Sequence, residues 1–127
     1  MTNNEVNKVI ADYMGEEYCK LPDNRSAIKF KIGNSQSVLK ENYYTNSLDA
    51  LVPVWHKAKL CFQYINKEDE RLEDLDNYYI PINGKYRAWV AEIGYYENYW
   101  SDKDTIQEAA AHATAKTILA FEVDNGE

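Results

Sequence analysis

The segment from Arg87 to Glu108 carries the residue types best suited to hold a small ligand. It is dense in aromatic rings, it contains cations, and a helix is predicted to begin at Thr105. Rings stack on bases, while a cation and the free N–H groups of a helix N-terminus bind phosphate. The sequence therefore predicts a nucleotide-type site, and its candidate residues are Arg87, Trp89, Tyr95, Tyr96, Tyr99, Trp100, Lys103 and Thr105.

The same segment has a second interpretation. Tyrosine rings also make good cross-strand pairs and subunit interfaces, because each ring is apolar with a polar tip. Thr105 and Glu108 form a capping-box pattern that occupies some of the helix N–H groups. Asp102 and Asp104 would repel phosphate. A structural or interface role for these tyrosines therefore remains open.

Catalytic and metal-binding patterns are missing from the sequence. The two histidines, His56 and His112, lie in predicted helices without a cysteine or carboxylate at metal-ligand spacing. No nucleophile elbow or glycine-rich phosphate loop occurs. We therefore expect neither catalysis nor a cofactor nor a metal.

Charge and composition limit the classes of partner. The net charge is −7, with 14 basic residues against 21 acidic ones, and the three arginines are scattered. Long nucleic acid and anionic membranes need clustered cations, so neither is expected as a partner. Two cysteines do not make a disulfide scaffold, and no signal peptide or membrane-length apolar run is visible. The predicted location is the cytoplasm.

The first half of the chain predicts two helices and one strand. Apolar residues at helical spacing predict a helix over 3–14, capped by Asn3 or Asn4 and stopped at Gly15. Residues 16–24 are expected to be a connector, and 27–32 alternates as a half-buried strand does. A second helix is predicted from Asn46 or Ser47, with an apolar stripe that reaches Phe62, and it is expected to end in the charged run 67–76, which should be a loop.

The second half predicts a hairpin followed by a helix. Residues 78–82 and 85–93 flank Asn83-Gly84, the pair that favours a type I′ turn. Pro81 suggests an edge strand, Gly94 a bulge, and 95–100 either more strand or an aromatic loop. The last helix presents mostly small side chains on one face, which permits close packing.

This order of elements predicts an α+β fold. We expect a small antiparallel sheet with about three helices packed on it, an αβα sandwich-like arrangement. Residues 1–127 are expected to form a single domain, with a frayed tail from about residue 124.

Three stretches of the chain resemble the phage ABA-sandwich domain family of small phage and prophage proteins. They are 7–15, the run from Tyr44 through Ser47 to Val54, and Thr105-x-x-Glu108-Ala109. The chain departs from many relatives by having Leu48 and Leu51, and no tryptophan, at the start of the second helix. The resemblance implies a sheet packed with helices.

The resemblance also implies a function. Similar small phage proteins act as sponges in Thoeris anti-defence, binding cyclic ADP-ribose isomers as homo-oligomers without cleaving them. The expected function is thus sequestration of a nucleotide second messenger, a cyclic ADP-ribose isomer or cyclic oligonucleotide, in the host bacterial cytoplasm. The alternative is a phage protein–protein interaction module that inhibits or adapts a host protein.

Overall fold

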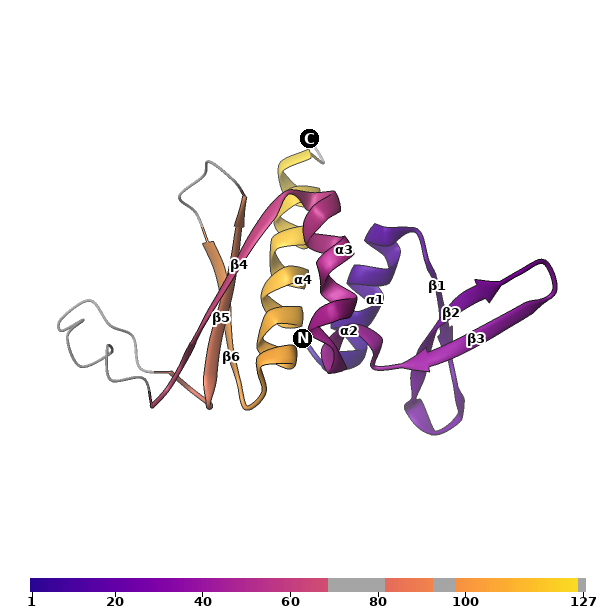
Figure 1. Cartoon of the computed structure of the whole chain (residues 1–127), viewed down its shortest axis with the longest axis horizontal. Coiled ribbons are helices and arrows are strands. Elements are labelled where there is room, and N and C mark those ends of the chain that lie inside the picture. Colours follow the sequence, from indigo (N-terminus) through magenta and orange to yellow (C-terminus); the bar gives the residue numbers. More distant parts are fainter. Residues whose placement is uncertain (69–81, 93–97, 126–127) are drawn as a thin grey trace.

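The computed structural model describes residues 1–68, 82–92 and 98–125. Two antiparallel three-stranded sheets flank a layer of helices (Figure 1). The predicted α+β class, with helices packed on an antiparallel sheet, is confirmed. The structure adds a second sheet and places the helices between the two.

The elements follow one another in a simple order. The N-terminal part holds α1 (Asn3–Met14), β1 (Glu17–Lys20), a 3-10 turn (Pro22–Asn24), β2 (Ser26–Ile32) and β3 (Gln36–Glu41). Two helices follow, α2 (Tyr43–Asn46) and α3 (Leu48–Ala58). The C-terminal part holds β4 (Leu60–Asn66), β5 (Tyr86–Glu92), β6 (Asn98–Lys103) and α4 (Ile106–Asn125). The sheet orders are β1-β2-β3 and β4-β5-β6.

Helix α1 has the predicted bounds but a different cap. Thr2 caps it, and a capping box forms because Glu5 lies three residues later and accepts from the Thr2 N–H. Asn3 and Asn4, the predicted caps, are already helical. Gly15 ends the helix with φ +74°, as predicted.

Sheet β1-β2-β3 contains two strands that the sequence did not predict. The connector 16–24 includes β1, which is only four residues long and has no alternating pattern. Strand β3 has no buried residue, so it lacks the apolar alternation that identifies a strand. The predicted strand 27–32 is β2, and it pairs with both.

Helix α3 ends at Ala58, well before the charged run 67–76 in which it was predicted to end. It starts after Ser47, whose hydroxyl accepts from the Ala50 N–H as expected, but it stops at Lys59 in the left-handed conformation. Phe62 lies on β4 instead. Its ring stacks on Trp55 with centroids 4.5 Å apart, so two residues at helical spacing meet across a helix–strand turn. The prediction of one long helix was therefore wrong.

The predicted hairpin is also corrected. Strand β5 forms, but its two edges are taken by β4 and β6 rather than by 78–82, and residues 78–81 lie outside the described ones. Asn83 does not have positive φ, so no type I′ turn forms at Asn83-Gly84. Gly84 is needed for another reason: an added Cβ would lie 2.9 Å from the Lys103 backbone. The charged run beyond residue 68, and Gly94, lie outside the described residues as well.

Helix α4 is the centre of the molecule (Figure 1). It packs on sheet β4-β5-β6 on one side and on α1, α2 and α3 on the other. Its small residues therefore pack on both sides, and those that are almost fully buried are Ala109, Ala110, Ala111, Ala113, Thr114, Ala115 and Thr117. The helix continues through Asn125, into the stretch expected to be frayed, while 126–127 lie outside the described residues. Among the described helices, none has the length and apolar character needed to cross a bilayer.

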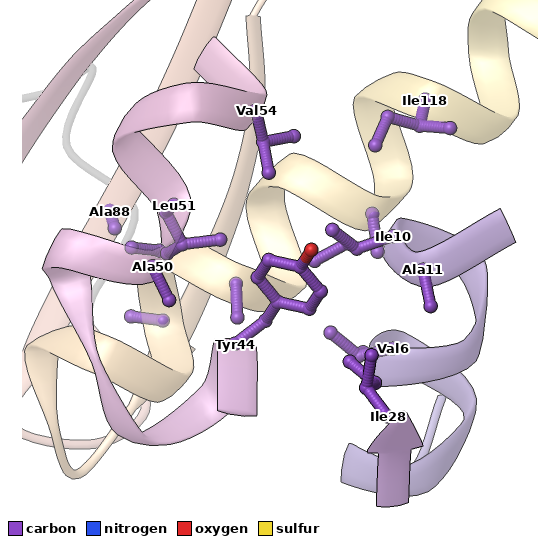
Figure 2. Close-up of a cluster of buried hydrophobic side chains, with 14 residues drawn as sticks. Val6, Ile10, Ala11, Ile28, Tyr44, Ala50, Leu51, Val54, Ala88 and Ile118 are labelled. Atoms are coloured by element: carbon purple, nitrogen blue, oxygen red, sulfur yellow. The ribbon is translucent and has the colours of Figure 1, made fainter. Parts of the chain in front are cut away.

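The core joins residues from both halves of the chain around Tyr44 (Figure 2). The ring of Tyr44 lies between Leu51 of α3 and Ile10 of α1, and the Tyr44 hydroxyl donates to Glu16. Burial and this bond to Glu16 raise the pKa of Tyr44 above its usual range. The buried side chain of Asn7 links α1 to α2. Its amide oxygen accepts from the Tyr44 N–H at 2.8 Å, and its amide nitrogen donates to the Thr45 hydroxyl at 3.1 Å.

We expect Asn7→Ala to lower the free energy of unfolding by about 1–3 kcal/mol, because it leaves the buried Tyr44 N–H without an acceptor. Urea unfolding followed by circular dichroism measures this change. Asn34→Ala, at an exposed turn position, is the matched control and should stay within about 0.5 kcal/mol of the original protein. Equal effects in the two variants would contradict the assignment.

Candidate functional site

Three of the predicted site residues, Arg87, Trp89 and Trp100, lie with Asp102 on one face of sheet β4-β5-β6. Ala88 and Val90 are fully buried, and β5 packs on α4, so the alternating Arg87 and Trp89 lie on the opposite face. Trp100 and Asp102 share that face because Ser101, between them, is buried.

The register brings these four side chains into two pairs. Trp89 is opposite Trp100, and Arg87 is opposite Asp102. With Gln63 of β4, which is opposite Trp89, they form what we call the aromatic face: Gln63, Arg87, Trp89, Trp100 and Asp102.

Arg87 is tied to Asp102 by a two-point ion pair. Its Nε and Nη2 donate to the two carboxylate oxygens at 2.7 and 2.8 Å, and the side chains are only 12% and 7% exposed. The Asn83 N–H donates to the same carboxylate at 2.9 Å. Burial alone would raise the pKa of Asp102. The bonds from Arg87 and Asn83 and the nearby positive charges outweigh burial, so this pKa lies below its usual value.

The ring of Trp100 is exposed but held in place. It is 41% exposed, and the Arg87 guanidinium lies 4.1 Å from the ring centroid. Lys116 of α4 donates to the Trp100 carbonyl at 2.9 Å, which places its ammonium 5.9 Å from the same ring. Trp89 is fixed in turn because its indole N–H donates to Gln63 at 2.9 Å. Both indoles therefore hold defined positions in the absence of a ligand.

The other predicted site residues lie elsewhere. Tyr99 and Lys103 alternate with Trp100 and so project from the opposite face of β6. The Thr105 hydroxyl accepts from the Glu108 N–H at 3.1 Å, so Thr105 serves as a helix cap. Tyr95 and Tyr96 lie outside the described residues. The structure thus gathers Arg87, Trp89 and Trp100, and separates them from Tyr99, Lys103 and Thr105.

Three residues of this region were not among the site residues predicted from the sequence. Asp102 is the partner of Arg87, Gln63 holds Trp89, and Lys116 is an exposed cation beside Trp100. Their contacts become visible only from the strand register and the position of α4. The alternation of side chains along a strand could, however, have placed Trp100 and Asp102 on the same face. Since Arg87 is already paired, Lys116 is the cation better placed to meet a phosphate near Trp100.

The two histidines lie on different helices and in different surroundings. His112 is buried at the centre of α4, and its Nε2 lies 2.7 Å from Asn3 Oδ1. Burial, followed by the positive charges of Lys103, the N-terminus and Lys116, lowers the pKa of His112 to about 4. His56 is exposed on α3. Across residues 1–68, 82–92 and 98–125, no three His, Cys, Asp or Glu side chains gather closely enough to hold a metal ion.

The low pKa of His112 predicts a pH-dependent stability. The folded protein keeps this histidine neutral down to about pH 4, whereas the unfolded chain takes up the proton near pH 6.5. The contribution is complete above pH 6.5 and is lost as the pH falls to 4, by on the order of 3 kcal/mol. Urea unfolding at several pH values should show this slope. His112→Gln should flatten the slope, and His56→Gln should retain it; an unchanged slope in His112→Gln would refute the assignment.

No protein-family model matches the chain, and no curated protein or solved structure matches it either.

Proposed function

We propose that this protein binds a nucleotide second messenger, a cyclic ADP-ribose isomer or a cyclic oligonucleotide, and sequesters it without cleaving it. In this proposal it is a phage anti-defence protein that acts in the host bacterial cytoplasm. The observation that carries the proposal is the pair of fixed, opposed indoles, Trp89 and Trp100, on an otherwise polar face. The sequence resemblance supports the same function.

The aromatic face offers two contacts that a nucleotide needs, a ring for its base and a cation for its phosphate. A base can stack on the exposed Trp100 ring, a contact worth about 1–3 kcal/mol. Lys116, whose bond to a carbonyl leaves other N–H donors, can meet a phosphate. Asp102 holds Arg87, and Arg87 supports the Trp100 ring from one side. Arg87 is then a positioning residue, whereas the sequence alone had suggested it as a phosphate ligand.

The side chains of the aromatic face fit a protein that binds a nucleotide without cleaving it. The carboxylate of Asp102 is committed to Arg87 and the Asn83 N–H, and its lowered pKa keeps it ionised. A general acid or base needs a pKa near the working pH and access to the substrate. Asp102 has neither property, so we propose a binding protein and not an enzyme.

Calorimetry against a panel of cyclic ADP-ribose isomers and cyclic oligonucleotides tests this function. We expect saturable binding of at least one member, and chromatography of the released ligand should recover it unchanged. Binding of no panel member would overturn the proposal, as would recovery of a cleaved product.

We further propose a homo-oligomer that forms through β3. All six residues of this strand are exposed, and Val38 and Leu39 are 36% and 49% exposed. In the described part of the chain β3 pairs only with β2, which leaves its outer edge open. Antiparallel pairing of two β3 strands about their midpoint would place Val38 of one copy opposite Leu39 of the other, a self-complementary contact.

Light scattering after size exclusion should therefore report an oligomer for the original protein. Leu39→Lys should shift it to a monomer, because two lysines would enter the apolar centre of the interface. Val52→Lys replaces another exposed apolar residue, which lies on α3, and should leave the oligomer intact. A monomeric original protein would refute this interface.

The same strand favours the second candidate function, a protein–protein interaction module that inhibits or adapts a host protein. An exposed edge with apolar side chains suits the addition of a partner's strand. A monomer that binds no panel nucleotide, but binds a purified host protein only while Leu39 is present, would support this candidate over the first.

A further inference from the structure

A cavity of about 410 Å³ lies at the other end of the molecule, between α1 and sheet β1-β2-β3. Its lining comes from the first turns of α1, from β1 and from the turn into β2, and consists of Asn4, Glu5, Lys8, Tyr18, Lys20, Leu21, Arg25 and Ser26. This volume falls within the range of small-molecule sites.

The residues that line the cavity include more cations than carboxylates, although the chain as a whole is acidic. Three cations, Lys8, Lys20 and Arg25, line it against one carboxylate, that of Glu5. The Glu5 carboxylate accepts from the Thr2 N–H at 3.1 Å as part of the helix cap, so it already has a partner. In a protein of net charge −7, three cations around one hollow favour a small anion over long nucleic acid.

The cations of this cavity can exchange partners easily. Lys8 pairs with Asp12 at 3.2 Å, and Arg25 pairs with Glu41 at 3.2 Å, with every one of these side chains at least 40% exposed. Exposed pairs of this kind contribute little to stability, so an anionic ligand can replace the carboxylate at little cost. The buried Arg87–Asp102 pair differs in this respect, because opening it would leave a desolvated charge.

The walls of the cavity are fixed by bonds between its own residues. The Tyr18 hydroxyl donates to the Asn4 carbonyl at 3.3 Å, and the Ser26 hydroxyl donates to the Asn4 side chain at 2.9 Å. These bonds join β1 and β2 to α1. Tyr18 and Leu21 add apolar surface beside the cations. The site is therefore formed before a ligand arrives, which lowers the entropy cost of binding.

We propose that this cavity binds the phosphate group of a small phosphorylated molecule, at a site separate from the aromatic face. Phosphate is favoured because its several oxygens can be shared among three cations. The cavity is lined by residues of α1, β1 and β2, whereas the aromatic face belongs to β4, β5 and β6, on the other side of α4 (Figure 1).

Titration with inorganic pyrophosphate, followed by ¹H–¹⁵N spectra of the labelled full-length protein, tests this site. Pyrophosphate has no ring to stack, so the result does not depend on the aromatic face. We expect saturable shifts of amides in the first turns of α1 and in β1 and β2. In Lys20→Gln and in Arg25→Gln the affinity should fall about tenfold or more.

Lys31→Gln is the matched control, since it removes the same charge from an exposed position of β2 that does not line the cavity. It should bind pyrophosphate as the original protein does. Shifts that do not saturate, shifts confined to other elements, or an equal loss of affinity in Lys31→Gln would each overturn the proposal.

Discussion

Replacing Asp102 by alanine is expected to lower the free energy of unfolding by about 3–5 kcal/mol. The reason is the state of Arg87, whose guanidinium donates twice to this carboxylate and is only 12% exposed. Removing the carboxylate takes both of these bonds from a nearly buried positive charge and also deprives the Asn83 N–H of its acceptor. Urea unfolding of the two proteins at pH 7 measures the difference.

Two further variants separate this explanation from a general effect of losing a carboxylate. Asp12→Ala removes an exposed partner of Lys8 and should cost no more than about 1 kcal/mol. Arg87→Met combined with Asp102→Ala should regain part of the stability, because the nearly buried positive charge is then removed together with its carboxylate partner. If Asp102→Ala were no more damaging than Asp12→Ala, the ion pair would not have the role assigned to it.

Replacing both tryptophans of the aromatic face is expected to weaken nucleotide binding by about 2–6 kcal/mol, from about 1–3 kcal/mol for each stacked ring. In the Trp89→Ala, Trp100→Ala variant the affinity for a bound panel member should fall at least thirtyfold, as measured by calorimetry. Tyr64→Ala removes another exposed ring from the same sheet, on the face opposite Trp89, and should leave the affinity unchanged. Equal losses in the two proteins would contradict stacking on the aromatic face.

The helix boundaries show what local patterns can predict. Gly15 and the Ser47 cap stop and start helices as the sequence indicates, because each acts through its neighbours alone. The end of α3 was not predicted, because the residue that ends it in the left-handed conformation is Lys59, and glycine is the residue usually expected there. Phe62 and Trp55 are seven residues apart, a spacing typical of one helix face, but their rings stack across the turn between α3 and β4.

Strand pairing was harder to predict, because it depends on contacts distant in sequence. Asn83-Gly84 has the composition of a hairpin turn, yet β5 obtains both of its neighbours elsewhere. Strand β3 has no buried face, so no pattern of apolar residues marks it.

For the candidate site, too, local sequence features were predictable, whereas contacts between distant residues were not. Ring density alone indicated Trp89 and Trp100, and the structure places them opposite one another. The assignment of Arg87 to phosphate did not anticipate Asp102, whose partnership depends on the register of β6. The cavity near Lys20 was not foreseen, because its cations come from α1, from β1 and from the turn before β2, and only the folded chain brings these together.

The most direct test of nucleotide stacking uses the three tryptophans of the chain as reporters. Each indole N–H gives one signal in a ¹H–¹⁵N spectrum. The Trp55 indole donates to Thr114 at 2.9 Å, away from the aromatic face, and so serves as an internal control. On addition of a cyclic ADP-ribose isomer or cyclic dinucleotide, we predict saturable shifts of the Trp89 and Trp100 signals and a stationary Trp55 signal. Stationary Trp89 and Trp100 signals under conditions where calorimetry shows binding would contradict the account.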